Sequence, residues 1–156
     1  MKKDKSLSVD FFLKMIEKYL SINLPKTYRN FLENYEAIDV INEKKVFILN
    51  NKTKESSSVD GFFYLTNDYN YSILENYKIY KDRIPENFFP IADDPFGNLI
   101  LISVKNADRD KIYFWDHEME VDDGETPDYS NLTLIADSFD EFIEGLYSID
   151  EISDDI

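Results

Sequence analysis

Residues 87–116 contain three apolar segments separated by turn-forming residues, and this stretch constrains the fold more than any other part of the chain. Residues 88–92 are short, apolar and bounded by turn formers, which predicts a β-strand. Residues 99–104 are uniformly apolar, so this segment is predicted to be a central strand covered on both faces. Residues 111–115 follow a polar interruption and are predicted to pair with the second segment as a hairpin. The rest of the chain must therefore cover the sheet that these strands begin.

The residues between the first two segments favour a tight turn. Asp93 and Asp94 are interpreted as turn formers rather than as a catalytic carboxylate pair. Pro95 fixes one φ angle, and Gly97 and Asn98 adopt positive φ easily. Gly97 is predicted to need positive φ or close backbone contact.

Segments with helical periodicity flank this stretch. Ser8 is predicted to cap a first helix, whose apolar positions are Val9, Phe12, Leu13, Ile16, Tyr19 and Leu20. Pro25 is predicted to open a second helix, with an apolar stripe formed by Tyr28, Phe31, Leu32 and Tyr35. Asn67 or Asp68 is predicted to cap a third helix, with Ile73, Leu74, Tyr77 and Tyr80 on the sheet. Ser138, with Glu141 at the capping-box position, is predicted to begin a last helix that buries Phe139, Phe142, Ile143 and Leu146.

The remaining apolar runs complete the predicted architecture. Residues 46–49 and 62–65 are predicted to form a hairpin around a mobile polar loop, and residues 132–136 a further strand. Strands joined by short polar loops predict an α+β fold, a mostly antiparallel sheet of five to six strands with helices packed on it. The length of 156 residues predicts a single domain over 1–156, with a core at about 8–147 and a flexible acidic end at 148–156.

Two of these segments resemble a known family. Residues 24–35 read Leu-Pro-Lys-Thr-Tyr-Arg-Asn-Phe-Leu-Glu-Asn-Tyr, and the central stretch contains Phe-Phe-Pro-Ile-Ala-Asp, a Gly-Asn turn and Ile-Tyr-Phe-Trp-Asp-His-Glu. These patterns are similar to the SUKH superfamily, which includes bacterial immunity proteins against polymorphic toxins and a fungal regulator of cell-wall synthesis. Many members continue the first pattern with Asn-Gly-Gly, where this chain has Glu-Ala-Ile-Asp at 36–39. The resemblance implies the same α+β architecture and a function in protein binding.

The distribution of charge is strongly asymmetric. Residues 1–111 carry 17 Asp or Glu and 17 Lys or Arg, whereas residues 112–156 carry 15 Asp or Glu and no Lys or Arg. The net charge of −15 therefore lies entirely in the last part of the chain. This disfavours nucleic acid and anionic membranes as partners of that surface and favours a basic partner. A purely solubilising surface with an acidic tail is the alternative.

Few residues suit catalysis or a cofactor. The chain has no cysteine, and its one histidine, His117, is interpreted as a polar residue at a strand end rather than as a metal ligand or general base. Residues 106–117 fail the calcium-loop pattern, because position six is Lys111 and position twelve is His117. We expect no enzyme activity, no cofactor, no metal and no nucleic-acid site, and no apolar run is long enough for a membrane span. A cytoplasmic protein is therefore expected.

The resemblance to the SUKH superfamily implies a non-enzymatic immunity protein that neutralises a toxin by direct binding. The acidic segment suits a basic, nuclease-type toxin, since a nuclease must carry positive charge to hold phosphates. The carboxylates expected to steer the partner are Asp116, Glu118, Glu120, Asp122, Asp123 and Glu125. Trp115 or Tyr129, if exposed, is expected to anchor it. A regulatory or scaffold interaction module without a toxin partner is the alternative function, and a merely solvated loop is the alternative interpretation of the site.

Overall fold

The structure is a computed structural model that describes residues 2–34 and 45–148, with side chains from Val9 onward. Its helices are α1 (Lys2–Leu20), α2 (Lys26–Asn34), α3 (Ile73–Tyr80) and α4 (Phe139–Glu144), with a 3₁₀ turn η1 (His117–Met119). Its strands are β1 (Val46–Asn50), β2 (Glu55–Ser58), β3 (Gly61–Phe62), β4 (Phe88–Asp93), β5 (Leu99–Ser103), β6 (Ile112–Trp115) and β7 (Leu132–Ala136).

Two antiparallel sheets confirm the predicted α+β class. Five strands pair in the order β3-β4-β5-β6-β7, and β1 pairs with β2 in a separate ribbon. Every residue of β5 is buried, as its uniformly apolar sequence predicts for a central strand. The predicted hairpin of β5 and β6 is also confirmed, with Leu101 opposite Tyr113.

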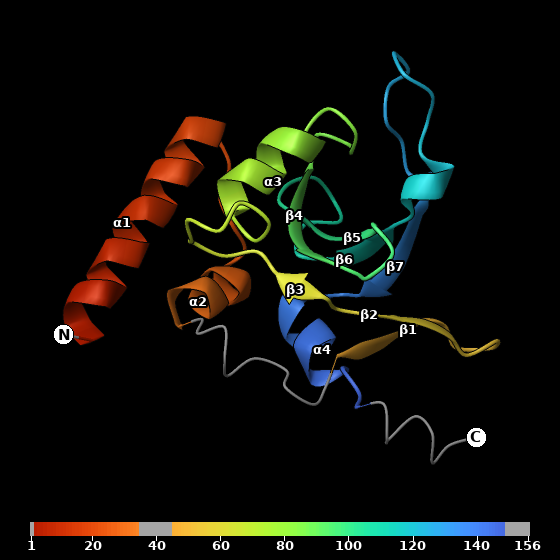
Figure 1. Ribbon diagram of the computed structural model, residues 1–156, viewed down its shortest axis with the longest axis horizontal. Helices are drawn as coiled ribbons and strands as arrows, with labels where there is room; N and C mark the ends of the chain where they lie inside the picture. Colours follow the sequence, from red (N-terminus) through yellow and green to blue (C-terminus); the bar gives the residue numbers. More distant parts are fainter. Residues whose placement is uncertain (1, 35–44, 149–156) are drawn as a thin grey trace.

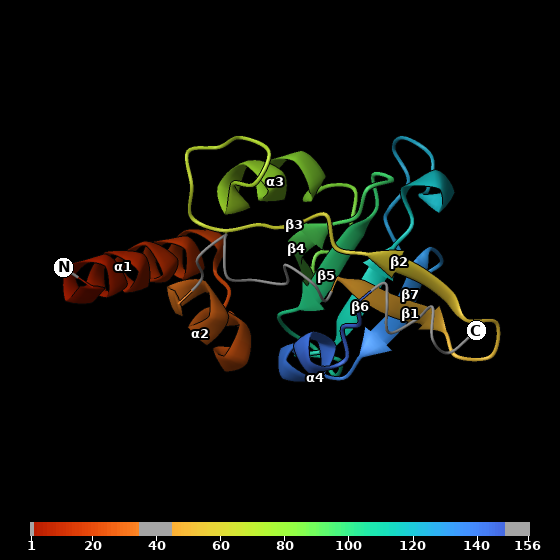
Figure 2. The same cartoon turned by 60° about the horizontal axis from the view of Figure 1, so that its bottom comes forward.

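The two faces of the five-stranded sheet are covered by different elements (Figure 2). On one face, Phe114 of β6 packs on Phe47 of β1, which in turn contacts Phe142 of α4. On the other face, Trp115 packs edge-on against Tyr80 of α3. Successive strand residues point to opposite sides, so Phe114 and Trp115 serve different halves of the core.

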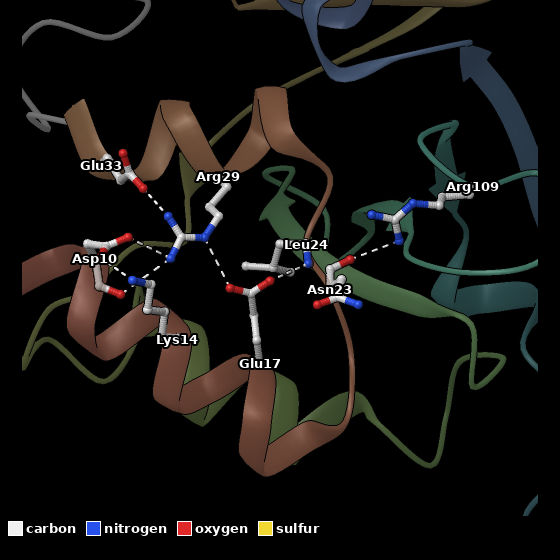
Figure 3. A network of polar contacts seen from close by, with 8 residues as sticks. All are labelled: Asp10, Lys14, Glu17, Asn23, Leu24, Arg29, Glu33 and Arg109. Atoms are coloured by element: carbon white, nitrogen blue, oxygen red, sulfur yellow. Dashed lines mark hydrogen bonds and ion pairs between the residues drawn. The ribbon is translucent and has the colours of Figure 1, made fainter.

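The helices α1 and α2 are joined through the guanidinium group of Arg29 (Figure 3). Arg29 Nε donates to Glu17 Oε1 at 3.0 Å, Nη2 lies 2.8 Å from Asp10 Oδ1, and Nη1 bonds Glu33. The other oxygen of Glu17 accepts the backbone N–H of Leu24 at 2.9 Å. The pKa of Arg29 is raised, because the effect of these carboxylates exceeds that of burial, which lowers it. This network fixes the angle between the two helices.

The first helix differs from its prediction. It begins at Lys2 rather than after Ser8, and it extends away from the sheet (Figure 1). Leu13 and Ile16 are buried, but Phe12 and Tyr19, which were expected to point inward, are exposed. Helical periodicity identifies the apolar side of a helix but not how far the body of the protein extends along it. In α2 the prediction is confirmed for Tyr28 and Leu32, which are buried, and Phe31 packs on Phe62 and Phe139.

Residues 46–65 also fold differently from the predicted hairpin. The polar segment Glu55–Ser58 forms β2 and pairs with β1, whereas Phe62 pairs with Ala92 in the other sheet. The third helix is capped by Ser72, whose side chain accepts the Glu75 N–H, and not by Asn67 or Asp68. Leu74 is partly exposed, and Asn76 is buried instead. The predictions for Tyr35, for 36–39 and for the end beyond Ser148 fall outside the described residues.

The last strand and helix follow the sequence closely. β7 forms at the predicted residues, and the Ser138 side chain accepts the Glu141 N–H at 3.1 Å at the start of α4. Phe139, Phe142 and Leu146 are buried. Within the described part of the chain, none of the helices is both long enough and apolar enough to cross a membrane.

Candidate functional site

The acidic loop, residues 116–130, connects β6 to β7 and projects from the sheet, in cyan in Figure 1. It contains no Lys or Arg. Its exposed carboxylates include four of the residues that the sequence suggested for steering a partner, namely Glu118, Asp122, Asp123 and Glu125. The loop therefore presents one sign of charge to solvent.

Asp116 begins the loop and has a structural role. Its Oδ1 accepts the N–H of Glu118 at 3.0 Å and caps the short 3₁₀ turn η1. Further along, Asp128 accepts hydrogen bonds from the hydroxyl and the backbone N–H of Ser130. These bonds hold the pKa of the Asp128 carboxyl below its usual value. They therefore favour the charged form of Asp128.

Glu120 differs from the other steering candidates, because it pairs with a basic residue outside the loop. Its two oxygens accept hydrogen bonds from Arg83 Nη2 at 2.7 Å and Arg83 Nε at 3.1 Å. The same guanidinium lies 5.0 Å from the ring centroid of Tyr80 and 5.4 Å from that of Trp115. Glu120 therefore ties the loop to the chain that follows α3.

Trp115 cannot act as the exposed anchor that the sequence allowed. Its side chain is 1% exposed, and it lies under Tyr80 and Arg83. Alternation along β6 could not settle this point, because both faces of that strand are covered. Trp115 belongs to the core that supports the loop.

Tyr129 lies partly in solvent, but its hydroxyl group is engaged. It donates to Asp108 Oδ2 at 2.6 Å and accepts from Asn87 Nδ2 at 2.8 Å. Its ring packs against Phe88 and Tyr113. Burial, followed by the bond to Asp108, raises the pKa of Tyr129 to about 12. Tyr129 is 44% exposed, so part of the residue remains available to a partner.

Three contributors to this region were not singled out by the sequence. Arg83 is one of many scattered basic residues, and Asp108 was considered only as a possible calcium ligand. The third is Phe96 at the β4–β5 turn, which is 72% exposed. Its position among turn formers was visible in the sequence, but its exposure beside the acidic loop was not.

A polar hollow of about 340 Å³ lies between β3, α3 and β4. It is lined by residues that include Asp60, Tyr71 and Asp93. Burial and the nearby Asp60 carboxylate raise the pKa of Asp93 to about 6. Asp93 is the last residue of β4, and its side chain accepts the N–H of Gly61 in β3 at 3.1 Å, so the prediction that it is a turn former is wrong, whereas Asp94 does lie in the turn. Among the described residues, no three His, Asp or Glu side chains are grouped so as to hold a metal ion.

The comparisons with known proteins agree with the resemblance noted in the sequence. The chain is 31% identical over 155 residues to the SPbeta prophage-derived uncharacterized protein YokK of Bacillus subtilis (strain 168). The match covers 90% of this chain and 76% of that protein. A model of the SMI1/KNR4 family (SUKH-1) matches residues 12–145, from the middle of α1 to the end of α4. This range includes every strand and the whole acidic loop, and the chain therefore belongs to the SMI1/KNR4 family (SUKH-1).

Proposed function

We propose that this protein is a non-enzymatic immunity protein that neutralises a basic, nuclease-type toxin by binding it directly. The observation that carries the proposal is the acidic loop, a projecting segment of one charge sign held in place at both ends. Family membership supports a role in protein binding, because the SUKH superfamily includes immunity proteins.

The charge on the loop suits a nuclease partner. An enzyme that cuts nucleic acid needs Lys and Arg to hold phosphates, so its active surface is positive. A surface with exposed carboxylates and no Lys or Arg can cover it and speed its encounter by long-range attraction. Covering the phosphate-binding surface would stop the toxin without any chemistry by the immunity protein.

The way in which the loop is fixed also favours binding. Glu120 is held by Arg83 near its start, and Tyr129 is held by Asp108 and Asn87 near its end. A loop restrained at two points loses less conformational entropy when it binds, which leaves more of the interaction energy for affinity. The carboxylates of Asp122, Asp123 and Glu125 lie between these two points.

The test of this function uses the product of a toxin gene next to the gene for this protein. Its C-terminal toxin domain is expressed with and without this chain, and cell growth and complex formation by gel filtration are measured. We expect growth to be restored and the two proteins to elute together. Growth arrest despite equal expression, with separate elution, would refute neutralisation.

A regulatory or scaffold module is the second candidate function, and one observation favours it. The outer side of α1 carries four exposed apolar side chains, namely Phe11, Phe12, Met15 and Tyr19. A patch of this kind is typical of protein contacts and lies apart from the acidic loop (Figure 1). This role would be favoured if no toxin gene lies nearby and if the Phe12→Asp substitution abolishes binding of a protein partner.

A further inference from the structure

The turn between β4 and β5 presents Phe96 on a rigid support. The carboxylate of Asp94 is 3% exposed and lies beneath the turn. Its Oδ1 accepts the backbone N–H groups of Phe96 at 2.9 Å and Asn98 at 2.8 Å. Its Oδ2 accepts the Ser57 hydroxyl at 2.8 Å and the Asn98 side-chain amide at 3.0 Å. One buried carboxylate therefore fixes the backbone on both sides of Phe96.

His117, at the start of the acidic loop, also forms hydrogen bonds with this turn. Its Nε2 lies 2.8 Å from the carbonyl oxygen of Phe96, which requires the Nε2–H tautomer as donor. Its backbone N–H donates to Asn98 Oδ1 at 3.0 Å. Gly97 has a φ of +88°, and a Cβ there would lie 3.2 Å from His117 Nε2. Hydrogen bonds thus connect the turn to the start of the loop and restrain both. Phe96 projects from this turn, and 72% of its surface is exposed to solvent.

An open groove of about 390 Å³ runs beside Phe96, between the β1–β2 hairpin and η1. Its wall carries the carboxylates of Glu55, Asp116 and Glu118 and the apolar side chains of Leu49 and Phe114. No Lys or Arg is among the described residues that line it. The groove therefore offers an aromatic face, carboxylates and no competing positive charge.

Guanidinium groups suit this combination better than other cations do. Arginine stacks on aromatic faces and binds carboxylates with two parallel hydrogen bonds, whereas lysine acts as a compact point charge. A preformed aromatic anchor also requires little ordering when it binds. Exposed aromatic side chains beside complementary charge are typical of the residues that dominate binding energy.

We propose that Phe96 and this groove are the docking surface for an arginine-bearing segment of a basic protein partner. This inference rests on the proposed function and names its contact surface: the acidic loop attracts the partner, and Phe96 anchors it. Phe96 takes the role that the sequence offered to Trp115 or Tyr129.

The test uses acetylated, amidated octa-arginine as the probe and the ¹⁵N-labelled full chain, at low and at physiological ionic strength. We expect the largest NMR shifts at Phe96, Gly97 and Glu118. Phe96→Ala should weaken binding by about five-fold, the size of a cation–π contact. Tyr19→Ala removes an aromatic side chain of α1 that is even more exposed than Phe96, and it should leave the affinity unchanged. Octa-lysine should bind several-fold more weakly than octa-arginine.

Three outcomes would overturn the inference: no binding of octa-arginine at low ionic strength, equal affinities of Phe96→Ala and wild type, or equal affinities for the two peptides. An unchanged thermal midpoint of Phe96→Ala shows that a loss of binding is not a loss of folding. The peptide test is independent of the toxin. A positive peptide result without protection of cells would reject the proposed function alone, whereas protection by Phe96→Ala at wild-type toxin affinity would reject the docking surface alone.

Discussion

The carboxylate of Glu120 binds the guanidinium of Arg83 through two hydrogen bonds, of 2.7 Å and 3.1 Å, across 37 positions of the sequence. Arg83 also lies over the rings of Tyr80 and Trp115. The acidic loop is therefore attached to the layer that covers the sheet. Glu120 therefore holds the loop in place, and the exposed carboxylates that follow it, Asp122, Asp123 and Glu125, remain available to attract a partner.

A double-mutant cycle of Arg83→Met and Glu120→Gln measures this fastening. The pair is bidentate, but both side chains are partly exposed. We therefore expect a coupling free energy of roughly 0.5–1 kcal/mol between the two substitutions in urea unfolding. The coupling should fall as salt is added. A coupling of zero at low salt would show that the pair does not hold the loop.

Asp93→Asn should change how stability depends on pH. The folded pKa of Asp93 is about 6 against an ordinary value of 3.8, so the folded protein binds this proton more tightly than the unfolded chain does. The contribution of Asp93 to the free energy of unfolding is therefore present below about pH 4 and is lost as pH rises through about 6. Allowing for solvent screening, the loss is about 1–2 kcal/mol.

Urea midpoints of wild type and Asp93→Asn between pH 4 and pH 7 measure this effect. The variant should lack the extra loss of stability and be the more stable protein at pH 7. Asp122→Asn, which changes an exposed loop carboxylate, should follow the wild-type curve. Parallel curves for wild type and Asp93→Asn would contradict the assignment.

Gly97 and Gly124 form a matched pair for the turn prediction. Both have a φ of +88°, but a Cβ at Gly97 would meet His117, whereas one at Gly124 meets nothing within 4 Å. An alanine at either site should be strained by about 1 kcal/mol from backbone conformation alone. Gly97→Ala should lower the unfolding midpoint more than Gly124→Ala, and Gly97→Val should lower it further. Equal decreases of the unfolding midpoint for Gly97→Ala and Gly124→Ala would show that close packing against His117 does not restrict Gly97.

Removal of the hydroxyl group is predicted to have opposite effects on stability at Tyr28 and at Tyr129. Tyr28 is fully buried, and no described group forms a hydrogen bond with its hydroxyl. Tyr28→Phe keeps the ring contacts with Phe89 and Phe139 and should leave the protein equally stable or more stable, by about 1 kcal/mol. Tyr129→Phe loses two hydrogen bonds and should cost about 1–2 kcal/mol. A clear loss on Tyr28→Phe, measured by chemical unfolding, would contradict this picture.

The centre of the fold could be predicted from the sequence because its signals are local. The strands β4, β5 and β6 are apolar runs separated by turn formers, and the Ser138 cap precedes an apolar stripe. The errors arise where the answer depends on distant parts of the chain. Strand β2 contains three serines and has no apolar alternation, so only its pairing with β1 makes it a strand. The exposure of Tyr19 depends on where α1 leaves the body of the protein.

The candidate site was predictable in charge but not in detail. A segment with 15 Asp or Glu and no Lys or Arg is visible in the sequence, and the loop carries much of that charge. The sequence does not show that Glu120 meets Arg83 or that Trp115 is buried beneath that pair. Nor does it show that His117 braces the turn of Phe96, 21 positions away. These are contacts between segments that only the tertiary fold brings together.

The central claim, that the acidic loop attracts a basic partner, is tested most directly by the association rate as a function of ionic strength. The partner used is the proposed one, the toxin domain of a toxin gene next to the gene for this protein. The loop variant changes Asp122, Asp123 and Glu125 to their amides. A control changes the exposed residues Asp137, Asp140 and Glu144, which lie in or next to α4, at the opposite end of β7 from the loop. Both variants have a net charge of −12, from −15 plus three.

We predict that at low salt the loop variant associates at least ten-fold more slowly than wild type, with a smaller change in dissociation, while the control stays close to wild type. The difference should largely disappear at physiological salt, where the Debye length is about 8 Å. Equal association rates for the loop variant and the control at low salt would contradict the claim and leave the loop a solubilising surface.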